Sequence, residues 1–86
     1  NNMTRHDSFT PNESINEGDF IEVFIDSSNT IEVCQVIKKF QDKVYQKQSR
    51  GLPRKPLGIC DCLSLDCRGI EETAFWCSEQ QRWLSD

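Results

Sequence analysis

Residues 19–25 are a run of mostly apolar, β-branched and aromatic residues, which predicts a β-strand. One face of this strand is aliphatic and the other is mixed, with Ile21, Val23 and Ile25 set against Phe20, Glu22 and Phe24. Residues 26–29 are Asp, Ser, Ser and Asn, which favour a turn because their side chains bond the local backbone. We therefore expect this strand to open a β-hairpin.

The second strand of the hairpin is expected over residues 30–40, which are rich in β-branched side chains. Ile31, Val33 and Ile37 share one face of this run. Cys34 points to the opposite face by alternation, and the pattern assigns it no chemistry.

Turn-forming residues divide the rest of the chain. A short third strand is expected over residues 43–48, and the Gly and Pro residues of 49–58 predict an exposed loop. Residues 60–69 contain three cysteines and are expected to form a tight turn. Residues 71–85 suit either a short helix or a strand, a turn and a second strand. We favour the strand pair, because a bent three-stranded sheet needs more strands to close its core.

The chain has 86 residues, which is room for one small domain with a thin core. Residues 1–17 are rich in Asn, Ser and Thr and are expected to form a flexible arm or linker. The domain itself, residues 18–86, is expected to be mainly β. Asn2 and Asn12 lie in glycosylation acceptor patterns, which matter only in a secreted chain.

Charge is unevenly distributed along the chain. There are 10 basic and 14 acidic residues, a net charge of −4, which argues against a dedicated nucleic-acid binder. Residues 35–58 nevertheless carry a net charge of +6. This segment gives an alternative partner, DNA, RNA or an acidic protein surface, contacted through Lys43, Tyr45, Lys47, Arg50, Arg54 and Lys55. No apolar run is long enough to span a membrane.

Four of the five cysteines follow the pattern C-x-C-x4-C-x9-C. Four thiolates on turns form the ligand set of a structural zinc site, so the candidate cofactor is zinc and the candidate ligands are Cys60, Cys62, Cys67 and Cys77. Two alternatives stay open. The cysteines are reduced and pack as small apolar residues, or they pair as disulfides in a secreted interaction domain, which the odd count disfavours.

The sequence offers no catalytic arrangement. His6 is the only histidine and lies in the predicted arm. There is no Gly-rich phosphate loop and no metalloprotease motif, and the clustered cysteines lie among acidic residues that disfavour reactive thiolates. We therefore expect a protein that is not an enzyme.

The segment CDCLSLDCRG at residues 60–69 resembles the post-SET knuckle of histone lysine methyltransferases. In that family, three such cysteines bind zinc together with a fourth from the catalytic domain. This chain has Leu63 where the family usually has Gly, and its upstream residues do not resemble the catalytic core. The resemblance implies zinc coordination by Cys60, Cys62 and Cys67, without methyltransferase activity.

Residues 18–48 are similar to the opening strands of SH3-like barrels in chromatin proteins, the bromo-adjacent-homology (BAH) and Tudor domains. The resemblance implies a small SH3-like barrel, in the nucleus, that binds a histone tail or a neighbouring chromatin protein. Aromatic faces beside a carboxylate bind methylated lysine. The candidate peptide-binding residues are therefore Phe20, Glu22, Phe24 and Trp83. A wider set of aromatic side chains, expected mostly to pack in the core, includes Phe40, Tyr45, Phe75 and Trp76.

Overall fold

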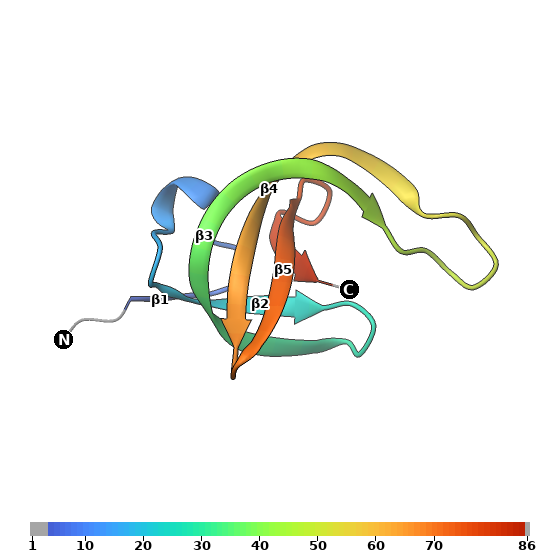
Figure 1. Ribbon diagram of the computed structural model, residues 1–86. Helices are drawn as coiled ribbons and strands as arrows, with labels where there is room; N and C mark the ends of the chain where they lie inside the picture. The colour runs from blue at the N-terminus through green and yellow to red at the C-terminus, as the bar shows by residue number, and fades with distance from the viewer. Residues whose placement is uncertain (1–3, 86) are drawn as a thin grey trace.

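A computed structural model describes residues 4–85 as a mainly β domain (Figure 1). Its strands are β1 (Arg5–His6), β2 (Phe20–Ile25), β3 (Thr30–Gln46), β4 (Lys55–Cys67), β5 (Ile70–Cys77) and β6 (Arg82–Ser85). One turn of 3-10 helix, η1 (Asn12–Ser14), precedes β2. Among residues 4–85 there is no α-helix, and no helix is long and apolar enough to cross a membrane.

Strands β2 to β6 form a closed ring. Each pairs antiparallel with the next along the chain, and β6 returns to pair in parallel with β2, where Leu84 lies beside Phe24. Strand β1 pairs in parallel with the first residues of β2. The long β3 arches over β4 and β5 (Figure 1). The mainly β fold and the small barrel predicted from the sequence are confirmed.

Buried apolar side chains form two clusters. The first consists of Ile15, Ile21, Val23, Cys34, Val36, Leu63, Leu65, Cys67, Ala74 and Trp83. The second consists of Cys62, Phe75, Cys77 and Leu84, with Phe24, Phe40, Val44, Leu57 and Cys60 packed against them. Cys62 and Leu63 are neighbours on β4 but belong to different clusters. Because side chains alternate along a strand, the clusters lie on opposite faces of the sheet.

Strand β3 changes its pairing at Ile37. The ladder with β4 shifts register just after Val36, which is a β-bulge. Cys34 and Val36 are buried, whereas Ile31 is 45% exposed and Ile37 is 50% exposed. The bulkier β-branched residues of this strand therefore lie outside, and the smaller side chains pack in the core.

The cysteine-rich segment is a strand where the sequence suggested a turn. Cys60, Cys62 and Cys67 all lie in β4, and only the Arg68–Gly69 turn separates β4 from β5. The segment is a strand because both of its edges are occupied, by β3 on one side and β5 on the other.

The predicted third strand is the last part of β3. Strands β3 and β4 therefore form one long hairpin, which we call the β3–β4 hairpin, with its tip at residues 47–54. The hairpin reaches beyond the barrel (Figure 1), and the domain measures 47 Å along its longest axis against 23 and 20 Å along the others. The strand pair favoured over residues 71–85 is confirmed as β5 and β6.

Residues 4–17 pack against the barrel, although their composition suggested a flexible arm. Ile15 is fully buried in the first cluster. The backbone N–H of Phe20 donates to the Thr4 carbonyl (2.8 Å), and that of Trp83 donates to the Ser8 carbonyl (2.7 Å). Backbone bonds need no particular side chain, so a polar segment anchored by one isoleucine is ordered here. Asn2 and its acceptor pattern lie outside the described residues.

Candidate functional site

A groove of about 540 Å³ runs along one face of the barrel and the base of the β3–β4 hairpin. Its lining includes three aromatic side chains and three carboxylates, Phe40, Tyr45, Phe75, Asp42, Glu71 and Glu72. We call it the aromatic–acidic groove. Sequence reasoning named Phe40, Tyr45 and Phe75 among the aromatic side chains expected mostly to pack in the core, and Tyr45 also as a candidate nucleic-acid contact, because their spacing does not show that they meet.

Strand pairing brings the aromatic side chains together. Phe40 pairs with Cys62, and Cys62 pairs with Phe75, so the three form a row across β3, β4 and β5. Asp42 lies two residues beyond Phe40 and so shares its face. Phe75 is buried whereas Tyr45 is 53% exposed. The row therefore forms an apolar floor, and Tyr45 stands at the rim.

The groove has the chemistry of a cation site. Aromatic faces attract ammonium and guanidinium groups, and neighbouring carboxylates add charge. The Lys38 ammonium already lies 5.5 Å from the centre of the Phe40 ring, so a ligand cation at that ring would have to displace Lys38. The chain outside residues 35–58 carries −10, since the total is −4 and that segment carries +6. This acidic charge favours cations on the β5 side of the groove, where Glu71 and Glu72 lie, while Lys43 of the basic segment lines the β3 side.

The predicted peptide-binding residues do not form one site. Phe20, Glu22 and Phe24 share one face of β2 and are half-buried. Glu22 forms an ion pair with Arg5, at 2.9 Å. Trp83 belongs to the other face of the sheet, in the first cluster.

Trp83 is a core residue. It is fully buried, its ring packs edge-on against Trp76 with 5.4 Å between centroids, and its indole N–H donates to the Thr10 carbonyl at 2.8 Å. A buried tryptophan needs such a partner for its N–H. Its position near the end of the sequence suggested a surface location, but the N-terminal segment covers it.

The ring of Phe24 is already in contact with a cation of the same chain, the guanidinium of Arg82. The guanidinium carbon of Arg82 lies 4.4 Å from the centre of the Phe24 ring and 4.6 Å from that of Phe9. Its Nε and Nη2 atoms donate to the Ser8 hydroxyl, at 3.3 and 3.0 Å. The aromatic pair formed by Phe9 and Phe24 is therefore filled, and a ligand cation would have to displace Arg82.

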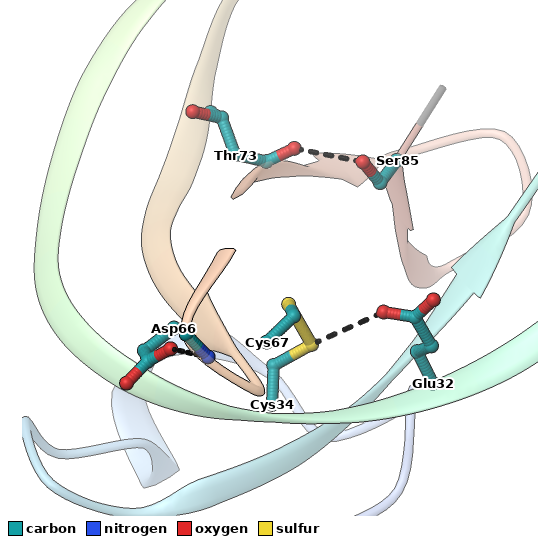
Figure 2. The surroundings of a disulfide bond; sticks show 7 residues. Glu32, Cys34, Asp66, Cys67, Thr73 and Ser85 are labelled. Carbon is teal, nitrogen blue, oxygen red and sulfur yellow. Dashed lines mark hydrogen bonds between the residues drawn. A yellow bond between two sulfur atoms is a disulfide. The ribbon is translucent and has the colours of Figure 1, made fainter. Parts of the chain in front are cut away.

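Cys34 and Cys67 are joined by a disulfide between β3 and β4 (Figure 2). The ladder pairs Gln35 with Asp66, so the two cysteines face each other at its end, with Cα atoms 4.5 Å apart. That is the separation of a non-hydrogen-bonded antiparallel pair. Sequence reasoning missed this partner because the cysteines are 33 residues apart and only the register unites them.

The four predicted zinc ligands are not assembled while this disulfide is present. Cys67 is bonded to Cys34, and the other candidates are thiols of the second cluster, Cys60, Cys62 and Cys77. Among residues 4–85, the group whose ligand atoms lie within 4.8 Å of one another is Glu32, Cys34 and Cys67. Its sulfurs are oxidised, and a metal needs thiolates, so this group offers its three ligand atoms only after reduction.

The thiols of β4 are protonated at neutral pH. Burial raises the pKa of Cys62 to about 11, and the charges of Cys60 and Asp42 add to the effect. Burial also raises the pKa of Cys60, followed by the influence of Cys77 and Asp61. Because the thiolate is the nucleophile and the metal ligand, both thiols are weakly reactive at neutral pH.

The basic candidates lie on the β3–β4 hairpin, and all of them are exposed: Lys43, Tyr45, Lys47, Arg50, Arg54 and Lys55. Lys55 pairs with Glu79 of the barrel at 3.2 Å. Arg54 donates to the Tyr45 carbonyl at 3.3 Å. Lys47 and Lys55 also line a second, polar groove of about 610 Å³ together with Asp26. The structure therefore brings the predicted basic set onto one protruding element.

His6 ties the N-terminal segment to the start of β2. Its Nε2 atom lies 2.9 Å from Asp19 Oδ2, and the backbone N–H of Asn16 donates to the same oxygen at 2.9 Å. The hydrogen bond with His6, followed by that from Asn16, lowers the pKa of Asp19. His6 is therefore part of a structural contact, which its place in a polar segment did not indicate.

A comparison with protein-family models gives no match, and no curated protein or solved structure matches the chain. The resemblances to chromatin barrels and to post-SET segments stay predictions of the sequence. The barrel itself follows from the strand pairing described above.

Proposed function

We propose that this domain is a non-enzymatic recognition module that binds a lysine- or arginine-rich protein segment in the aromatic–acidic groove. The observation that carries the proposal is that three aromatic rings and three carboxylates line one groove. Aromatic rings attract cations to their faces, and the carboxylates compensate the charge. A histone tail, the partner expected from the sequence, is one segment of this chemistry.

We expect the aromatic–acidic groove to bind a basic peptide with modest affinity. A cation over an aromatic ring contributes about 0.5–1 kcal/mol when exposed and about 2 kcal/mol when desolvated. Tyr45 at the rim is exposed, and Phe75 on the floor is buried, so the groove offers both kinds of contact. One exposed and one desolvated contact together contribute about 3 kcal/mol, which by itself corresponds to a dissociation constant weaker than millimolar.

The disulfide is informative about the cellular compartment in which the domain functions. Disulfides persist in oxidising compartments and are rare in the nucleus. Cys34–Cys67 therefore supports the secreted alternative over the nuclear location implied by the chromatin resemblance. A basic segment of an extracellular protein fits the groove as well as a histone tail does.

Calorimetric titration with a short lysine-rich peptide tests the proposal. Tyr45→Ala and Glu71→Gln should each weaken binding by about tenfold, or about 1.4 kcal/mol. The same peptide with glutamine in place of every lysine should not bind. NMR shifts should centre on the residues of the aromatic–acidic groove.

Glu13→Gln is the matched control, because it removes the same charge from η1 and does not line the groove. It should change the affinity by less than about twofold, as expected for an exposed distant charge. If Glu13→Gln weakens binding as much as Glu71→Gln, the peptide is held by net charge alone. If Tyr45→Ala has no effect, the groove is not the site.

The protruding hairpin supports a second candidate, contact with a polyanion such as DNA or RNA. Its basic side chains are exposed on one element, where they can follow a phosphate backbone. Lys47→Ala should lower the slope of log affinity against log salt for duplex DNA by about one. Lys39→Ala is the matched control, because Lys39 lies on the barrel and donates to the Asn12 carbonyl. Lys47 does not line the aromatic–acidic groove, so the peptide and DNA experiments are independent.

A further inference from the structure

The free thiols Cys60 and Cys77 lie on neighbouring strands and face the same cluster. The β4–β5 ladder ends where Cys62 pairs with Phe75. The same register continued by two residues sets Cys60 opposite Cys77. Both side chains pack in the second cluster, and the charge of Cys77 acts on the titration of Cys60, so the two sulfurs are near each other.

The disulfide already present also lies just beyond the end of a ladder. Cys34 and Cys67 lie one step beyond the last pair of their ladder, Gln35 and Asp66, and they are bonded with a Cα separation of 4.5 Å. Facing positions on antiparallel strands have Cα atoms about 4.5–5.5 Å apart, within the range that a disulfide spans. Cys60 and Cys77 lie two steps beyond the last pair of the β4–β5 ladder, on the other edge of β4.

We propose that Cys60 and Cys77 form a second disulfide when the domain meets a low-molecular-weight disulfide such as oxidised glutathione. Cys60 is partly exposed, whereas Cys77 and Cys62 are buried, so the oxidant reaches Cys60 first. The β3 strand holds Cys60 from its other side through the pairing with Asp42. The bond closes when the ends of β4 and β5 approach each other.

The thiol–disulfide exchange with oxidised glutathione takes place in two steps. The Cys60 thiol loses its proton to solvent, attacks one sulfur of oxidised glutathione and releases one glutathione thiolate, which leaves a mixed disulfide on Cys60. The Cys77 thiol then loses its proton, attacks the Cys60 sulfur and releases the second glutathione. The protein loses two protons and two electrons, and one oxidised glutathione becomes two reduced molecules.

Cys62 is excluded from the pair by its position. It is 2% exposed and lies between two aromatic rings, with Phe40 on one side and Phe75 on the other. It is two residues from Cys60 on the same strand, about 6.6 Å away, which is at the upper limit of the Cα separation that a disulfide spans. The proposal therefore leaves Cys62 as the one free thiol of the oxidised domain.

Peptide mapping of the full chain tests the proposal. The protein is treated with oxidised glutathione at about pH 8.5, the ordinary pKa of a thiol, and then blocked with N-ethylmaleimide. Trypsin and endoproteinase Asp-N separate all five cysteines, because Asp61 and Asp66 divide those of β4 and Arg68 precedes the Cys77 peptide. We expect peptide 55–60 to be linked to peptide 69–82.

Two variants make the result specific. Cys77→Ser should stop at the glutathione adduct on Cys60, whereas Cys62→Ser, a change in the same cluster, should still give the link. The proposal is overturned by a link that contains Cys62, by a stable Cys60 adduct in the wild-type chain, or by five peptides that show only the Cys34–Cys67 link.

Discussion

The indole nitrogen of Trp83 donates a hydrogen bond to the backbone carbonyl of Thr10, 2.8 Å away and 73 residues earlier in the chain. This bond fixes the N-terminal segment over the buried ring. Trp83→Phe removes the donor and leaves the carbonyl without it, which should cost about 1–3 kcal/mol. The free energy of unfolding in urea measures this loss.

Ile15 gives an independent check on the same segment. It is fully buried, so Ile15→Ala should lower the free energy of unfolding by about 2–5 kcal/mol through lost burial and a cavity. Glu13→Ala, two residues away and exposed, should change it by less than about 0.5 kcal/mol. Equal stability of Ile15→Ala and the wild type would show that residues 4–17 are not part of the fold.

The Cys34–Cys67 disulfide should contribute measurably to stability. It links residues 33 apart, and the loop-entropy account gives about 3–4 kcal/mol for such a crosslink. The double variant Cys34→Ala with Cys67→Ala should therefore unfold at a lower urea concentration than the oxidised wild type. A reductant should lower the midpoint of the wild type and leave that of the double variant unchanged. A wild-type midpoint that does not respond to complete reduction would contradict this account.

Asp19 should make the domain sensitive to acid. Its pKa is lowered in the folded state, chiefly by the hydrogen bond with His6, so its stabilising effect is complete above the ordinary Asp pKa of about 3.9. The effect is lost as the pH falls through the lower, folded value. Asp19→Asn should flatten the fall in stability below about pH 4, and His6→Gln should do so in part. The urea midpoint of each variant is measured across this pH range. If the stability of Asp19→Asn falls with pH as steeply as that of the wild type, the prediction is wrong.

Cys62 should make the domain sensitive to alkali, with the opposite sign. Burial raises its pKa to about 11, so the unfolded chain releases this proton first as the pH rises. Stability should therefore be full below the ordinary thiol pKa of about 8.5 and fall as the pH approaches 11. Cys62→Ala should show a shallower fall. In the native wild type, iodoacetamide should modify Cys60 well before Cys62, and the reverse order would contradict the burial of Cys62.

The local sequence pattern was sufficient to predict strands whose pairing partners are close in the sequence. The alternation of β2 correctly separates Ile21 and Val23, which are buried, from the half-buried Phe20 and Phe24. On β3 the residue type misleads, because Cys34 packs inside through its disulfide while Ile31 stays outside.

The candidate site depends on contacts that no local pattern contains. Phe40, Cys62 and Phe75 meet because two ladders, β3–β4 and β4–β5, are in a particular register. A β-bulge after Val36 sets part of that register, and spacing alone does not locate a bulge. The burial of Trp83 likewise depends on a segment that seemed too polar to fold.

The disulfide also decides what happens if the tip of the β3–β4 hairpin is cut. Residues 47–54 are exposed and contain Lys47, Arg50 and Arg54, which makes the tip a substrate for trypsin-like proteases. A cut after Arg50 divides the chain into residues 1–50 and 51–86, and Cys34 lies in the first piece while Cys67 lies in the second. The two pieces remain one covalent molecule with the barrel strands still paired. The nicked domain is therefore heavier than the intact domain by one water molecule, and it separates into two fragments only under reducing conditions.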